Sequence, residues 1–302
     1  MTTSTPPPTD VTRDTYVLGI HRWVAGSFGL LTVFGSDWLT TQLIPESDAE
    51  LVLNKYLPYP SLVVYRSWGI TILAIAALVH LALSFHPSER VVVCRCLSIM
   101  FAIETAVFAR EAIDPTLGSS PGAVEFATLF TVLCGTYLWA SLGKIPQQST
   151  QSTPANSERT MLSMVIQLHS LLAFSSGLIA LLQPQGLYDY PKNLLMLDAD
   201  NLGKPSPPEL FAIQCWGAFI VGIGMLCTQV PSFDVTSQKR FGTAMLFQFV
   251  SLTVLFWSEW PQLNLVYKWG GVPIFGSMSL LYMIALGLLP NQPPSSSAKK
   301  TQ

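Results

Sequence analysis

Eight long apolar runs limit the folds that this sequence can adopt. They lie at about 16–38, 63–85, 91–113, 122–143, 161–183, 209–230, 241–260 and 266–289. A helix needs roughly 20 mostly apolar residues to cross a bilayer. Half of the residues are hydrophobic and only 11% are charged, which is too apolar for an ordinary soluble domain. The sequence therefore predicts an all-α integral membrane protein with eight transmembrane helices, surrounded by the lipid bilayer.

The sequence also repeats itself at a constant spacing of 148 positions. Trp68-Gly69, early in the second run, matches Trp216-Gly217 early in the sixth. The other matching pairs are His21 and His169, Ala25 and Ala173, Ser27 and Ser175, Gly29 and Gly177, Pro60 and Pro208, Leu62 and Leu210, and Glu111 and Glu259. A constant offset over such a span predicts two copies of one unit. Because each copy holds four spans, both enter the bilayer in the same direction, as two parallel four-helix repeats.

These patterns divide the chain into five predicted parts. Residues 1–15 form a proline-rich disordered tail, and residues 16–143 form the first four-helix repeat. A polar linker rich in Ser, Thr and Gln follows at 144–160, where the repeat requires a boundary. Residues 161–289 form the second repeat, and 290–302 form a disordered C-terminal tail.

The distribution of basic residues predicts the orientation in the membrane. Ten Lys and Arg residues lie on the side of the two termini, against six on the other side, which carries two acidic loops around 46–50 and 189–200. By the positive-inside rule both termini are cytosolic. The C-terminal "KKTQ" resembles a dilysine retrieval signal, which favours a multi-pass protein of the endoplasmic reticulum membrane. The alternative is an ordinary solvated tail.

Composition and motifs exclude several functions. A net charge of −2 gives no reason to expect nucleic acid as a partner. The five cysteines lie in or beside apolar runs without a CxxC pair, so they read as buried thiols. No nucleotide-binding loop, HExxH or aspartate-rich diphosphate motif occurs. The sequence predicts no cofactor and no metal. His21 and His169 could still ligate one haem from two sides, or be interfacial histidines kept after duplication.

Ionisable residues inside the apolar runs are candidates for function, because they are costly in a bilayer. Glu104 lies near the middle of the third run. Glu111 follows two helical turns later and shares one face with Glu104 and Phe108. Glu259 is the second-copy match of Glu111. The alternative for Glu111 and Glu259 is a pair of interfacial carboxylates at helix ends.

Arg66 and His80 share a face of the second run at opposite depths. Arg66 can hold an anionic group, pair with Glu111, or extend to the membrane interface. The simplest interpretation of His80 is a polar group with a partner between helices.

An aromatic belt at the membrane surfaces explains Trp68, Trp139 and Trp216 less easily than the other tryptophans, which lie nearer to the ends of the runs. An indole face lining a cavity stabilises a cation by roughly 0.5–2 kcal/mol. The alternative is helix packing around Trp-Gly steps, where glycine leaves room for the large neighbour.

The eight-span topology, chain length, intramembrane Glu104 and many aromatics resemble the fungal membrane-bound terpene cyclases of the ascochlorin and ascofuranone type. This resemblance implies metal-free, proton-initiated cyclisation of an epoxidised prenyl chain on an aromatic or polyketide head, in meroterpenoid biosynthesis. It also implies a hydrophobic prenylated small-molecule substrate and upstream membrane enzymes that supply it. A buried carboxylic acid stays protonated and can start such a reaction, so Glu104 is our candidate proton donor.

The repeat unit also resembles a four-span animal membrane protein family induced by a tumour-suppressor transcription factor. Arg66 to Gly69, Arg95 with Glu104, and "ALLQPQGLYD" from Ala180 carry this likeness. It implies a non-enzymatic scaffold or interaction protein. A transporter is a third interpretation with little support, because parallel repeats lack broken helices here.

The direction in which Glu104 points separates these hypotheses. A cyclase requires it to face an apolar cavity lined by Trp or Phe, whereas a scaffold leaves it in a packed seam or pairs it with Arg66 or His80. Glu104 maps on Leu252 and Arg66 maps on Gln214. This asymmetry places the expected site in the first copy.

Overall fold

A computed structural model describes residues 12–36, 60–113, 122–142, 160–187, 189, 207–263 and 265–289. The N-terminal tail up to residue 11, the linker residues 144–159 and the C-terminal tail with its "KKTQ" end lie outside the described residues. So do residues 46–50 and most of 189–200, the two acidic loops.

Helices make up the fold in the part of the chain that is described, and no strand occurs there. The long helices are α1 (Arg13–Phe34), α4 (Pro60–Ala82), α5 (Pro87–Ile113), α6 (Ala123–Ser141), α7 (Met161–Leu182), α9 (Pro207–Gln229), α10 (Val235–Ser258) and α11 (Leu265–Ala285). Seven of the described helices are long and apolar enough to cross a membrane, and a shorter apolar stretch, Gly270–Ala285, forms most of α11. The protein is thus an all-helical, multi-pass membrane protein.

Local sequence explains where several helices begin. Proline is the first residue of α4, α5 and α9, where its missing N–H costs nothing and its fixed φ suits a helix. Thr160 precedes α7, and its side chain accepts a hydrogen bond from the Ser163 N–H. Asp234 precedes α10 and accepts from the N–H groups of Thr236 and Ser237 at 2.7 and 3.0 Å.

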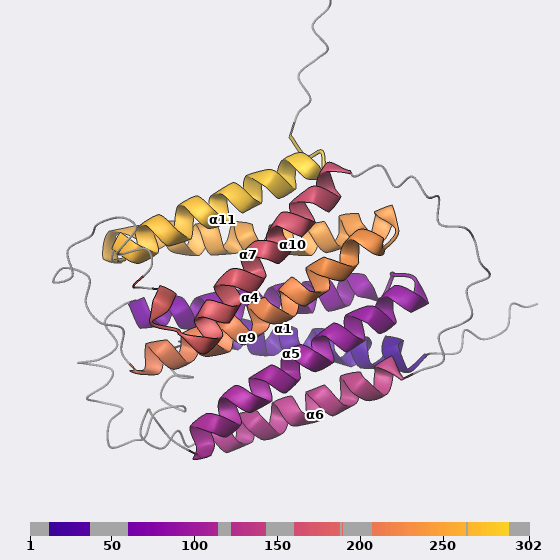
Figure 1. Cartoon of the computed structure of the whole chain (residues 1–302), viewed down its shortest axis with the longest axis horizontal. Coiled ribbons are helices and arrows are strands. Elements are labelled where there is room, and N and C mark those ends of the chain that lie inside the picture. Colours follow the sequence, from indigo (N-terminus) through magenta and orange to yellow (C-terminus); the bar gives the residue numbers. More distant parts are fainter. Residues whose placement is uncertain are drawn as a thin grey trace, which may run out of the picture.

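We call α1, α4, α5 and α6 the first half and α7, α9, α10 and α11 the second half. Within the first half α1 packs on α4 and α5 packs on α6, and within the second half α7 packs on α9 and α10 packs on α11. Across the halves α4 contacts α9 and α10, and α9 contacts α5. In Figure 1, α11 lies at the upper edge with α10 behind it, α5 and α6 lie at the lower edge, and α4, α7 and α9 lie between them.

The Trp-Gly steps mark two close helix contacts. A Cβ added to Gly69 would lie 2.9 Å from the backbone nitrogen of Val33, and one added to Gly217 would lie 2.8 Å from that of Leu181. Both distances are too short for a real Cβ atom. Glycine is therefore needed where α4 crosses α1 and where α9 crosses α7, which supports the packing interpretation of these steps.

Polar contacts join the halves where α5 and α10 begin. The Glu89 carboxylate accepts from the N–H of Asp234 at 2.6 Å and from the hydroxyl of Ser237 at 2.7 Å. Burial opposes ionisation of Asp234, but hydrogen bonds from the side chain and N–H of Ser237 and from the N–H of Thr236 outweigh it and lower the pKa of this carboxyl. Nearby, Arg90 donates to Asp14 at 2.5 Å and ties α5 to α1.

Candidate ligand chamber

A buried histidine, tyrosine and phenylalanine form the same cluster in each half. In the first half His21 Nδ1 shares a hydrogen bond with the hydroxyl of Tyr137, and Phe101 stacks on that tyrosine with ring centroids 5.7 Å apart. In the second half His169 Nδ1 bonds the hydroxyl of Tyr282 at 2.9 Å, and the ring of Phe249 stacks on Tyr282 at 5.9 Å.

The tyrosines of these clusters show that the fourth helices of the two halves match at a spacing different from 148 positions. Tyr137 and Tyr282 are 145 positions apart, whereas the histidines and phenylalanines keep the spacing of 148. The segment between the third and fourth helices is therefore three residues shorter in the second half. With the spacing of 145, Phe126 of α6 corresponds to Gly271 of α11.

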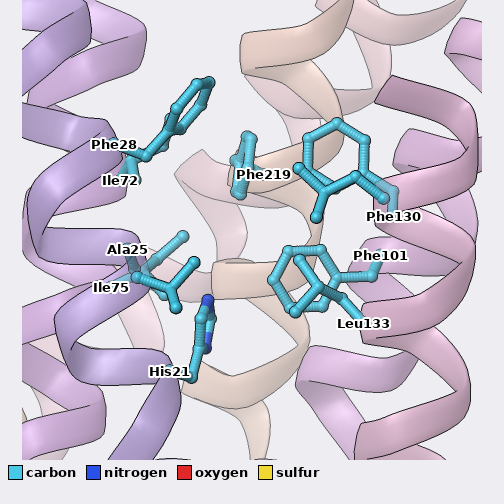
Figure 2. A pocket seen from close by; sticks show the side chains of 11 residues that line it. His21, Ala25, Phe28, Ile72, Ile75, Phe101, Phe130, Leu133 and Phe219 are labelled. Atoms are coloured by element: carbon cyan, nitrogen blue, oxygen red, sulfur yellow. The ribbon is translucent and has the colours of Figure 1, made fainter. Parts of the chain in front are cut away.

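Each histidine forms part of the wall of a small apolar cavity. The first has a volume of about 40 Å³ and is lined by His21, Phe28, Phe101 and Phe130 among others. Figure 2 shows the His21 imidazole with one ring nitrogen turned toward the space between the aromatic rings. The second, about 60 Å³, is lined by His169, Gln248, Phe249 and Phe275 among others.

A larger chamber of about 220 Å³ lies beside the second of these cavities. Side chains from α4, α7, α9, α10 and α11 line it, including Val64, Trp216, Phe256, Tyr267 and Phe275. The lining is almost wholly apolar or aromatic. A concave apolar space with a few polar groups is the usual form of a small-molecule site.

The chamber lies at positions of the second half whose equivalents in the first half are filled by aromatic rings. In the first half Phe28 packs edge-on against Trp68 at 5.8 Å, and Phe126 stacks on Phe108 at 5.2 Å. The corresponding residues of the second half, Ser176 and Gly271, both line the chamber. Only part of the space is taken up by Phe256, the counterpart of Phe108, whose ring lies directly against Gly271.

One ionisable pair reaches the chamber wall. The hydroxyl of Tyr267, which lines the chamber, donates to Glu209 Oε1 at 2.5 Å. Glu209 is buried in the first turn of α9. A short hydrogen bond between a phenol and a carboxyl group at an apolar wall is a route by which a proton can move to a bound molecule.

Glu104 lies in a packed seam and lines neither the chamber nor either histidine cavity. Its side chain is 0% exposed, and both carboxyl oxygens are buried without a hydrogen-bond partner among the described residues. The thiol of Cys215 on α9 is close enough to interact with Glu104 electrostatically. The expectation of a cavity in front of Glu104 is therefore not met, and the chamber is lined mainly by the second half. The first half has an open groove of about 380 Å³ between α5 and α6 and a hollow of about 140 Å³ beside His21 and Tyr137, and Glu104 lines neither.

The other predicted acid–base residues are placed around the ends of α4, α5 and α10. Arg66 Nη1 donates to Glu259 Oε1 at 2.9 Å, so Arg66 forms an ion pair with a residue of the second half. Glu111 of the first half was the partner that the sequence suggested. Glu111 is buried and close enough to Tyr65 and Cys215 to act on both electrostatically. His80 bonds the guanidinium of Arg22 at 3.1 Å.

Of the four predicted aromatic site residues, Trp216 lines the chamber. Trp68 is fully packed against Phe28 and Phe219, and Phe108 is enclosed by Phe126, Phe130 and Phe211. Trp139 is 47% exposed on the outside of α6, beneath the guanidinium of Arg13 at 4.8 Å. The structure thus brings one of these four to the chamber.

The structure does not bring His21 and His169 together as two ligands of one haem. His21 and His169 lie in separate cavities, and each bonds a tyrosine of its own half. No group of three His, Cys, Asp or Glu side chains converges among the described residues.

Sequence reasoning missed Tyr267, Glu209, Ser176 and Gly271. The last two could have been found by comparing the halves, because each replaces a phenylalanine at the matching position. Tyr267 and Glu209 carry no such signal, since α9 and α11 bring them together from positions 58 residues apart.

The helices, the chamber and the Tyr267–Glu209 pair at its wall together define a multi-pass helical membrane protein with an apolar chamber between its helices. Residues 22–289 match the model of a family described as a domain of unknown function, DUF8292, and the chain belongs to that family. No curated protein and no solved structure matches the chain.

Proposed function

We propose that this protein takes up an elongated apolar small molecule of the prenyl class into the chamber of its second half. The observation that carries the proposal is the chamber itself, about 220 Å³ between five helices with apolar and aromatic walls. Ser176 and Gly271 stand where the first half uses two phenylalanine rings. An internal hollow of this kind costs packing energy, which a bound ligand recovers.

The chamber belongs to one copy of a duplicated unit in this proposal. We take the chain to be two parallel four-helix repeats, together forming eight transmembrane helices. The matching His–Tyr–Phe clusters, the Gly69 and Gly217 crossings and the equivalent helix pairs support that arrangement. One copy then keeps the compact packing, and the other has the space to bind.

The reaction that we propose is proton-initiated cyclisation, as the likeness to fungal membrane-bound terpene cyclases implies. Tyr267, held by Glu209, passes its hydroxyl proton to an epoxide oxygen of the ligand. The C–O bond opens, an internal alkene closes the ring onto the cation, and the cation then loses a proton to the Tyr267 phenolate, which completes an isomerisation. Trp216, Phe256 and Phe275 border the chamber and can stabilise the cation.

The test is to fill the chamber as the first half is filled. Ser176→Phe places a ring where Phe28 has one, and we expect uptake of farnesol and cyclisation of an epoxidised farnesyl phenol both to fall at least tenfold. Microsomes carrying the wild type or the variant are assayed by chromatography and mass spectrometry for an isomer of unchanged mass.

Ser175→Phe is the matched control, because Ser175 is the exposed neighbour on the same helix and faces away from the chamber. It should leave binding and conversion unchanged. If Ser176→Phe binds farnesol as the wild type does, the chamber is not the ligand site. Binding without conversion in the wild type would keep the ligand proposal and remove the cyclase.

A non-enzymatic membrane scaffold is the second candidate. The observation that favours it is the position of Glu104 in a packed seam, since an acid that starts cyclisation has to reach the ligand. A scaffold predicts no uptake of prenyl compounds by the wild type, so the same assay separates the two candidates.

For the location we propose the endoplasmic reticulum membrane with both termini in the cytosol. The excess of Lys and Arg on the side of the termini and the C-terminal "KKTQ" support it. In that orientation the Tyr267–Glu209 pair lies toward the lumenal ends of α9 and α11.

A further inference from the structure

The chamber adjoins the cavity of His169. The two spaces share Ser176, Trp216, Ile274 and Phe275 in their linings. Along α11 the combined lining of the two spaces runs from Tyr267 to Met278, which is about 16 Å at the rise of an α-helix. A single elongated molecule that occupied both spaces would therefore have its long axis roughly along α11.

The two ends of this compound space carry polar groups, whereas its middle is apolar. The Tyr267–Glu209 pair is at one end. At the other end lie His169, which is 4% exposed, and Gln248, which is 1% exposed. Gln248 Oε1 is buried without a hydrogen-bond partner among the described residues.

His169 has one ring nitrogen committed and one open. Its Nδ1 is held by the hydroxyl of Tyr282, at 2.9 Å. Nε2 makes no hydrogen bond within the described residues. It is also not one of the fully buried side-chain atoms without a partner, so it keeps some accessible surface. Because His169 lines the cavity, Nε2 is the nitrogen available to a ligand there.

The first half lacks this arrangement, although it has the same histidine cluster. Met100 stands at the position of Gln248, and Phe28, which lines the His21 cavity, stands at the position of Ser176. His21 lines this cavity of about 40 Å³ and a separate hollow of about 140 Å³ with Tyr16, Leu133 and Tyr137, and neither has a glutamine or another amide in its lining. A polar acceptor next to an open imidazole at the end of a long apolar space is thus a property of the second half.

We propose that the ligand of the chamber is an apolar chain with a hydroxyl group at one end, and that this hydroxyl binds between His169 and Gln248. The inference rests on the proposed function, since it names the ligand class of the same chamber. A hydroxyl donates one hydrogen bond and accepts others. It donates to Gln248 Oε1 and accepts from Nε2–H of His169, in the tautomer in which the Tyr282 hydroxyl donates to Nδ1.

The hydroxyl end then lies opposite the Tyr267–Glu209 end. An alcohol or phenol with a prenyl chain meets both requirements, because its chain reaches toward the acidic pair while its hydroxyl occupies the deep end. A pure hydrocarbon leaves the buried Gln248 oxygen without a partner, and that costs affinity.

Farnesol and farnesene test this inference, because they share a chain and differ in the terminal hydroxyl. Dissociation constants are measured by native mass spectrometry of the full chain released from detergent micelles. We expect the wild type to bind farnesol about tenfold more tightly than farnesene, the size of one good hydrogen bond. His169→Phe and Gln248→Met should each remove most of that preference while farnesene binding persists.

His21→Phe is the matched control, since it removes the same histidine cluster from the half without the chamber. It should keep the tenfold preference. A wild type that binds both probes equally, or a preference that survives in His169→Phe and Gln248→Met, would overturn the hydroxyl site but leave the chamber proposal standing. A preference lost equally in His21→Phe overturns it as well. If neither probe binds the wild type, the proposed function fails with it.

Discussion

The first and second halves of this protein share their helix pairs, their glycine crossings and their His–Tyr–Phe clusters, yet they fill the space beside those clusters differently. Phe28 and Phe126 occupy it in the first half. Ser176 and Gly271 leave it open in the second, where a chamber of about 220 Å³ results. The two halves thus use the same helix pairs but place different amounts of side-chain bulk between them.

The halves also differ in where they bury polar groups. The first half buries Glu104 in a seam without a hydrogen-bond partner among the described residues, and the second half has Leu252 at that position. The second half instead places Gln248 beside an open imidazole, where the first has Met100. Of Glu104 and Gln248, only Gln248 lines one of the cavities described above.

The largest expected effect comes from hollowing the first half. Phe28→Ser removes a ring that packs on Trp68 and Phe126, so we expect the free energy of unfolding to fall by about 3 kcal/mol. Thermal unfolding in detergent micelles measures it. Phe34→Ser, at a side chain 84% exposed on the same helix, is the control and should change stability little. An unchanged unfolding midpoint in Phe28→Ser would mean that the halves are not packed differently.

Glu104→Leu makes the seam of the first half like that of the second. Removing a buried carboxyl without a hydrogen-bond partner should raise the free energy of unfolding by about 1–3 kcal/mol, because the folded state no longer carries the desolvation cost of that group. The reverse change, Leu252→Glu, should lower it. Conversion of the epoxidised substrate should persist in Glu104→Leu. A folded variant that has lost conversion would restore Glu104 as the proton donor and contradict the role of the Tyr267–Glu209 pair.

The smallest effect concerns the starts of α5 and α10. Asp234→Ala removes the side chain that accepts from two N–H groups, and about 1 kcal/mol of stability should be lost at pH 7. The folded pKa of Asp234 lies below its ordinary value, so this contribution is present above about pH 4 and disappears as the pH falls through the folded pKa. Melting curves of wild type and variant should therefore converge as the pH is lowered below about 4.

His86 holds the position of Asp234 in the first half and supplies no carboxylate there. His86→Ala should show no such convergence on acidification. Curves that stay equally far apart for Asp234→Ala as the pH falls would show that the charge of Asp234 does not contribute to the cap.

Much of the fold could be predicted from the sequence because it depends on local periodicity and length. The expected run at 161–183 and the helix Met161–Leu182 differ by a single residue, whereas the run expected from 241 begins six residues earlier, at Val235. Hydropathy does not register the polar first turn of that helix, which Asp234 caps. Helix starts of this kind are set by single side-chain contacts.

The candidate site shows where sequence reasoning stops. Depth in the membrane and residue type singled out Glu104, Glu111, Glu259 and Arg66, but depth does not tell which face of a helix meets a cavity. Arg66 reaches across the halves to Glu259, and Glu104 meets a packed seam. The direction of each side chain follows from how α4, α5, α9 and α10 pack, and a single sequence does not contain those crossings.

By itself the sequence determined an all-helical membrane protein, because apolar runs of this length must satisfy their backbone groups within helices. It also determined which glycines, histidines and tryptophans recur at a fixed spacing. Only the tertiary structure decided that the second half is hollow and that Tyr267 meets Glu209. A cavity is space left between side chains of five helices, and its existence depends on all of them at once.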